Sequence, residues 1–90
     1  MRILARNVQN NYASEVIDHN NMKFKIEFSY EMVTKLTMYT INENGLHTIG
    51  SKYDLSGFKE MNTLSLTNGE KMAIALYDLK IAEDYIKQIF

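Results

Sequence analysis

The chain contains no cysteine, no proline and no tryptophan, and only four of its 90 residues are glycine. Without cysteine it has no disulfide, thiolate nucleophile, iron–sulfur cluster or cysteine-ligated zinc site. Four isolated glycines do not form a glycine-rich phosphate loop. Because a cysteine-free composition fits a reducing compartment, we expect a cytoplasmic protein.

The chain also lacks an excess of charge and a long apolar run. Ten basic and eleven acidic residues give a net charge of −1, which is unlike the basic excess of most proteins that bind a phosphate backbone. Its longest apolar run is the six residues Met72–Tyr77, whereas a membrane span needs about 20. The N-terminus has no apolar export segment. We therefore expect neither membrane insertion nor export.

Hydrophobic residues make up 46% of the chain, so it is expected to fold rather than remain disordered. A chain of 90 residues has room for one core, and we predict a single compact domain over residues 1–90. A core of this size is thin, because a small domain buries only about 60–65% of the surface that its unfolded chain exposes.

Alternating apolar and polar residues predict strands in the first two thirds of the chain. The clearest runs over residues 23–30, where Phe24, Ile26 and Phe28 alternate with polar side chains. Residues 34–41 are rich in β-branched and aromatic side chains and predict a central strand. Asn44-Gly45 predicts a tight hairpin into a return strand over 46–53, with Gly50 marking a bulge.

Four further segments have weaker patterns. Residues 2–8 predict a short strand, and 54–62 a connection anchored by Phe58. A short edge strand is expected over 63–66. Between the asparagine pairs at 10–11 and 20–21, the spacing of Tyr12, Val16 and Ile17 predicts a short helix or a structured loop.

The C-terminal third predicts a long helix. Thr67 and Glu70 match a capping box, in which each side chain bonds the other residue's backbone N–H, and a helix from Asn68 to about Ile89 follows. The fold expected is therefore α+β: a small antiparallel sheet of three to five strands with the C-terminal helix across one face, plus the short N-terminal helix or loop.

This helix has two apolar faces. One broad stripe is expected to pack on the sheet, and it consists of Ala75, Leu76, Leu79, Ala82, Ile86, Ile89 and Phe90. Four residues fall on the opposite side of the helix: Ile74, Tyr77, Ile81 and Tyr85. A single sheet does not cover both faces. The second face is expected to be covered by residues 1–18, by a second copy in a homodimer, or by another protein, and we predict these four residues as the partner or dimer interface.

The sequence predicts no catalytic, cofactor-binding or metal-binding residues. His19 and His47 lie on different predicted elements, whereas a zinc site without cysteine needs three or more His or carboxylate ligands. Glu83 and Asp84 lie beside Lys80 and Lys87 and are expected to form a solvated helix edge. No hydrolase, phosphate-loop or dinucleotide motif occurs. We therefore do not expect an enzyme.

Asn, Ile, Lys and Tyr account for 32 of the 90 residues, and all four have A/T-rich codons. A short cysteine- and proline-free chain of this composition is similar to small accessory proteins of phages and mobile elements, many of which block a host protein, as anti-CRISPR proteins do. This similarity implies a stoichiometric inhibitor or regulator that binds an unidentified host or defence protein. The alternative is a nucleic-acid-binding regulator or an antitoxin-like protein. Nucleic acid is the less favoured partner, because in 23–30 the lysines and the aromatic residues point to opposite faces.

Overall fold

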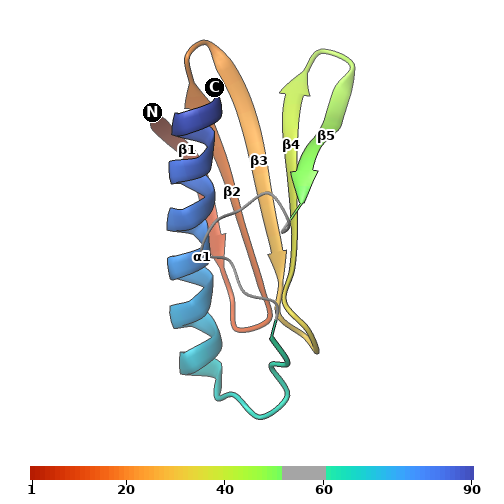
Figure 1. Cartoon of the computed structure of the whole chain (residues 1–90), viewed down its shortest axis with the longest axis vertical. Coiled ribbons are helices and arrows are strands. Elements are labelled where there is room, and N and C mark those ends of the chain that lie inside the picture. Colours follow the sequence, from red (N-terminus) through yellow and green to blue (C-terminus); the bar gives the residue numbers. More distant parts are fainter. Residues whose placement is uncertain (52–60) are drawn as a thin grey trace.

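A computed structural model describes residues 1–51 and 61–90 of the chain. Five antiparallel strands lie in the sheet in chain order, and one long helix follows them (Figure 1). The elements are β1 (Arg2–Val8), β2 (Tyr12–His19), β3 (Met22–Ser29), β4 (Lys35–Asn42), β5 (Gly45–Ser51) and α1 (Asn68–Ile89). The expected antiparallel sheet followed by a packed C-terminal helix is therefore confirmed, with five strands described.

Tight turns between the strands follow from residues that tolerate a positive φ. Asn20 and Asn21 have φ angles of 51° and 65° and connect β2 to β3, because asparagine adopts this left-handed region more readily than most residues. Gly45 has a φ of 111° at the start of β5, and the Asn42 side chain accepts a hydrogen bond from the Asn44 backbone at 2.8 Å. The predicted Asn-Gly hairpin is confirmed.

The short helix or structured loop predicted between residues 10 and 21 is wrong, because that segment forms β2. Its inward side chains are Ala13, Glu15 and Ile17, and all three are buried. A glutamate at the central inward position hides the period of two that identifies a strand. The helical spacing of Tyr12, Val16 and Ile17 mixes residues from both faces of this strand, so it does not describe an apolar stripe.

Helix α1 begins and ends where the sequence predicts. The Thr67 Oγ1 accepts a hydrogen bond from the Glu70 backbone N–H at 3.2 Å, and the Glu70 Oε1 accepts one from the Thr67 N–H at 3.0 Å. These two bonds satisfy N–H groups that would otherwise have no partner at the helix start. The same bonds to Thr67 lower the pKa of Glu70.

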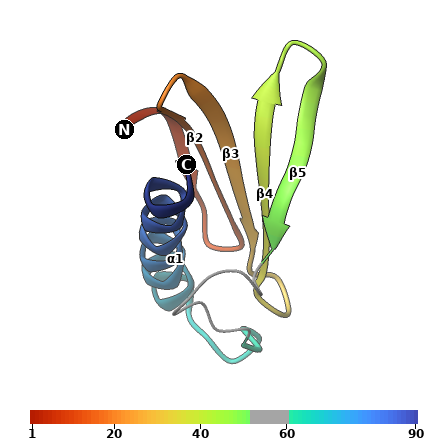
Figure 2. The same ribbon diagram turned by 45° about the horizontal axis from the view of Figure 1, so that its top comes forward.

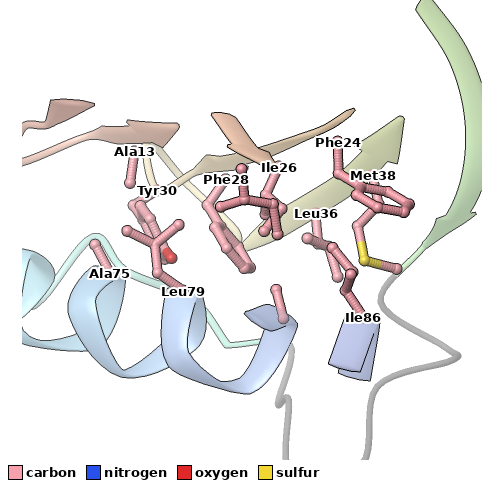
Figure 3. Packing of buried hydrophobic residues seen from close by; sticks show 12 residues of the cluster. Ala13, Phe24, Ile26, Phe28, Tyr30, Leu36, Met38, Ala75, Leu79 and Ile86 are labelled. Atoms are coloured by element: carbon pink, nitrogen blue, oxygen red, sulfur yellow. The ribbon is translucent and has the colours of Figure 1, made fainter. Parts of the chain in front are cut away.

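The core lies between one face of the sheet and α1, which crosses over β1, β2 and β3 (Figure 2). We call this the inner face. Figure 3 shows the inward side chains of the strands meeting those of the helix. Twelve buried hydrophobic residues form this core: Ala13, Ile17, Phe24, Ile26, Phe28, Tyr30, Leu36, Met38, Ala75, Leu79, Ala82 and Ile86. The stripe predicted to pack on the sheet is therefore confirmed for Ala75, Leu79, Ala82 and Ile86, and Phe90 packs against the same core. The prediction is wrong for Leu76 and Ile89, which lie at the two edges of the stripe and are 51% and 58% exposed.

The segment that leads into α1 differs from its prediction. Residues 63–66 do not form a strand; the only pairing described nearby is a single bridge between Val33 and Asn62. The buried Thr63 hydroxyl instead donates a 2.6 Å hydrogen bond to the Tyr30 carbonyl and so ties this segment to the end of β3. The strand pairing shifts between Met38 and Tyr39, opposite Gly50, which agrees with the predicted bulge. Phe58 lies outside the described residues.

Candidate partner-binding surfaces

Of the four helix residues predicted as an interface, the structure exposes one. Tyr77 is 63% exposed, whereas Ile74, Ile81 and Tyr85 are half-buried and pack against the core. They lie on the same flank of α1 as Asp78, whose carboxylate accepts a hydrogen bond from Tyr30 at the end of β3. That flank therefore faces the β3 side of the sheet, where these three side chains extend the core. Tyr77 is the one member of the set available to a partner as it stands.

The opposite flank of α1 faces β1 through an ionic cluster. The Arg6 Nε lies 2.6 Å from the Glu15 Oε2, and an Arg6 terminal nitrogen lies 3.8 Å from the Glu83 Oε2. Arg6 of β1 thus bridges a carboxylate of β2 and a carboxylate of the helix. Both carboxylates are buried, whereas the Arg6 side chain is 41% exposed. The cluster fixes α1 over the first two strands, because a buried carboxylate requires a nearby cation.

The pKa values in this cluster are shifted by burial and by neighbouring charge. Burial, and then repulsion from Glu15, raises the pKa of Glu83, although Arg6 opposes the shift. The hydrogen bond to Glu15 raises the pKa of Arg6, which remains charged. The second oxygen of Glu15 is buried without a hydrogen-bond partner among the described groups. Without Arg6, the neighbouring carboxylates of Glu15 and Glu83 would repel each other and destabilise the fold.

A second polar contact joins α1 to the sheet. The Tyr30 hydroxyl donates a 3.1 Å hydrogen bond to the Asp78 Oδ2, and both residues are buried. Burial raises the pKa of Tyr30, so its hydroxyl keeps the proton that it donates. Burial raises the pKa of Asp78 to about 6, with the Tyr30 bond acting against the shift. Figure 3 shows Tyr30 directed at the helix.

Neither polar contact has the composition of a metal site. In the described ranges, no group of three or more His, Cys, Asp or Glu side chains is arranged to hold a metal ion. His19 and His47 are each near an asparagine of their own hairpin, Asn20 at 3.3 Å and Asn42 at 3.2 Å. We infer that these buried polar groups hold α1 on the sheet.

The first strand is exposed over almost its whole length. β1 lies at one edge, and every residue from Arg2 to Asn7 is exposed, including Ile3 at 43% and Leu4 at 41%. Leu4 occupies an irregularity in the pairing with β2, between Ile3 and Ala5. On the helix, the exposed Leu76 lies seven residues before Glu83 and therefore on the β1 flank.

We call the free edge of β1 with Ile3, Leu4 and Leu76 the β1 edge surface. The sequence does not identify Ile3 and Leu4 as edge residues, because a short apolar strand looks the same at the edge of a sheet as at its centre. It assigns Leu76 to the stripe that packs on the sheet, whereas the structure exposes this residue. The ionic cluster is not predictable from the sequence either, because Arg6, Glu15 and Glu83 are far apart in the chain and come together only in the fold. The one available signal was Arg6 among apolar residues.

The chain matches no known protein family, no curated protein and no solved structure in comparisons of sequence and fold. No helix in the part of the chain described here is long and apolar enough to cross a membrane. A functional assignment therefore rests on the surfaces themselves.

Proposed function

We propose that this protein acts by binding another protein stoichiometrically and that the β1 edge surface makes the contact. The observation that carries the proposal is a seven-residue edge strand whose residues 2–7 are all exposed and include two large apolar side chains. An edge strand has a row of backbone N–H and C=O groups without a neighbouring strand. A partner segment that pairs with this row extends the sheet by one strand.

Specificity in such a complex comes from side chains that alternate along the strand. Ile3 and Leu4 supply the apolar contact on β1, and Leu76, which is 51% exposed, supplies it from the helix. The irregular pairing at Leu4 interrupts the flat edge that would favour indiscriminate strand pairing. The surface is therefore better suited to binding one specific partner than to aggregation through strand pairing.

The proposed role is that of an inhibitor or regulator that comes from a phage or mobile element and acts on a host or defence protein, as the composition of the chain suggests. The favoured occupant is a foreign protein with a strand-forming segment. A second copy is the alternative, since two β1 strands related by a two-fold axis also pair antiparallel.

A charge placed on the edge tests this proposal. Leu4→Lys puts an ammonium in the apolar contact, whereas Leu46→Lys adds the same charge at a leucine of β5 that is 49% exposed. We expect the partner captured from the native host by the wild type, and its one-to-one mass by native mass spectrometry, to be lost with Leu4→Lys and kept with Leu46→Lys. Capture of the same partner by both variants would overturn the assignment to β1.

Sedimentation separates the two occupants. A dimer that dissociates with Leu4→Lys and not with Leu46→Lys identifies a second copy. A wild type that is monomeric throughout the concentration range, and yet forms the one-to-one complex, identifies a foreign protein.

The predicted helix interface is tested by two tyrosines. We expect Tyr85→Ala to lower stability, because Tyr85 packs against the core, and Tyr77→Ala to leave it unchanged. Loss of the partner with Tyr77→Ala at unchanged stability extends the interface onto the helix. Retention of the partner restricts the interface to the β1 edge surface.

A further inference from the structure

The sheet face turned away from α1 carries a strip of lysines and tyrosines. We call it the outer face. Strand pairing places Lys25 of β3 beside Val16 and Tyr39, and Ser29 beside Tyr12 and Lys35. Six residues of this face matter here: Arg2, Tyr12, Lys23, Lys25, Lys35 and Tyr39. Lysines and aromatic residues do point to opposite faces within β3, but β2 and β4 add tyrosines to the lysine face.

The outer face is positive although the chain as a whole is slightly negative. Within the described strands it carries four cationic side chains and two carboxylates, which gives +2 where the whole chain has −1. Both carboxylates have a partner: Asp18 lies 3.6 Å from Arg2, and Glu27 lies 3.0 Å from Lys25. Lys23 and Lys35 are exposed, and neither forms an ion pair within the described residues.

The two unpaired lysines lie at opposite ends of this strip. Lys35 pairs with Ser29, six residues along β3 from Lys23, which separates the two backbone positions by about 20 Å at the rise of a strand. A hollow of about 350 Å³ lies at the Lys23 end, where Asn21 and Asn42 also line it. A second hollow, of about 230 Å³, lies at the Lys35 end and includes Glu31 in its lining.

Tyr39 lies between these ends, whereas Tyr12 lies at the Lys35 end, on the other side of Ser29 from Lys35. Tyr39 is the direct neighbour of Lys25 across the strands, and both Tyr12 and Tyr39 are half-buried. The hydrogen bond to Glu27 is the main cause that raises the pKa of Lys25, and the hydroxyls of Tyr12 and Tyr39 raise it further. A phenol ring on an open sheet presents a surface on which a nucleobase stacks whatever its identity.

This combination favours one class of polymer. Lysine is depleted in protein–protein interfaces, and this face has three. Among the described residues no helix covers this face, so its side chains are open to a ligand. Single-stranded nucleic acid has exposed bases for the tyrosines and phosphates for the lysines. We propose that the outer face binds single-stranded nucleic acid, with Tyr12 and Tyr39 stacking on bases and Lys23 and Lys35 contacting phosphates.

Fluorescence anisotropy with labelled 15-nucleotide DNA and RNA strands, and with the matching duplexes, tests this proposal. At 50 mM salt we expect the wild type to bind the single strands more tightly than the duplexes. Tyr39→Ala is expected to weaken binding by about 5- to 100-fold, the effect of one lost base stack, and Tyr39→Phe to keep it. A folded wild type that binds no strand at 50 mM salt, or that binds duplexes as tightly, would overturn the proposal.

A matched charge pair tests the lysines. Lys23→Gln/Lys35→Gln removes two charges from exposed positions of the outer face, whereas Lys80→Gln/Lys87→Gln removes two from exposed positions of α1. The first variant is expected to reduce the slope of log affinity against log salt by about 1.4, the share of two phosphate contacts, and the second to leave it unchanged. If both variants reduced the slope equally, the effect would depend on net charge alone, and this result would contradict a binding site on the outer face.

The comparison of DNA with RNA decides which strand is preferred, and Leu4→Lys separates this activity from protein binding. That variant is expected to keep single-strand affinity, because Leu4 lies on the β1 edge surface. The protein-binding proposal therefore fails or stands independently of this one.

Discussion

The two faces of the sheet share five strands but bury their side chains to different extents. On the inner face, Phe24, Ile26 and Phe28 of β3 are fully buried beneath α1. On the outer face of the same strand, Lys25, Glu27 and Ser29 remain partly exposed. Adjacent residues of a strand point to opposite faces. A residue that determines stability is therefore followed directly by one that is free to recognise a partner.

The largest expected difference is between two aromatic residues on opposite faces. Phe28→Ala removes a ring that stacks on Tyr30 at a centroid distance of 5.9 Å, and it is expected to cost about 3–5 kcal/mol of unfolding free energy. Tyr39→Ala on the outer face is expected to cost about 1 kcal/mol, since its ring is only half-buried. Urea unfolding followed by circular dichroism measures both. Equal losses would show that the outer face is packed as tightly as the core.

The next effect compares two arginines of β1. Arg6→Ala leaves Glu15 and Glu83 close together without their shared cation, and it is expected to cost about 3 kcal/mol, the lower end for a broken buried pair because Arg6 is part-exposed. Arg2→Ala breaks an exposed contact with Asp18 and is expected to cost less than about 1 kcal/mol. Chemical denaturation at pH 7 gives both values. If Arg2 proved as costly as Arg6, the ionic cluster would not fix the helix.

A pH dependence follows from Asp78 on the inner side of α1. Its pKa rises from 3.8 in the unfolded chain to about 6 in the fold, so the folded state holds the proton more tightly. Its contribution to stability is therefore fully present below about pH 4 and is lost as pH rises through about 6, by about 2 to 3 kcal/mol.

Asp78→Asn removes this titration and is expected to flatten the stability profile between pH 4 and 7, while Glu83 continues to act in the same direction. Asp84→Asn, which alters an exposed ion pair with Lys80 on the same helix, is expected to leave the profile unchanged. Thermal unfolding at several pH values measures the profiles. A profile unaffected by Asp78→Asn would contradict the buried-carboxylate explanation.

The smallest effect is expected from the outer-face ion pair. A double-mutant cycle of Lys25→Ala and Glu27→Ala is expected to give a coupling energy below about 1 kcal/mol, reduced further by salt. A coupling as large as that between Arg6 and Glu15 would erase the energetic distinction between the two faces.

Local chemistry explains which parts of the fold were predictable. The capping residues Thr67 and Glu70 define the start of α1, and Asn44-Gly45 defines a hairpin, because each signal acts within four residues. β3 was predictable because every inward residue is apolar. β2 was not, since Glu15 at its centre makes the strand look polar on both faces, and the cation that allows its burial belongs to another strand.

The candidate surfaces were less predictable than the fold. The helix stripe of Ile74, Ile81 and Tyr85 has the spacing of an exposed face, yet the helix is rotated so that these side chains meet the core. The tyrosines of the outer face come from strands on either side of β3, and their approach to Lys25 depends on strand register. Neither relation is encoded within one element.

The sequence by itself determined the class of the fold, the bounds of its helix and its hairpin at Asn44-Gly45, because propensities, caps and periodicity act over short distances. Tertiary structure alone decided which strand lies at the edge, which flank of α1 is covered and which charged groups meet in the core. Those outcomes depend on long-range pairing and on the burial of groups that are distant in the chain. The β1 edge surface and the outer face are both products of that second level.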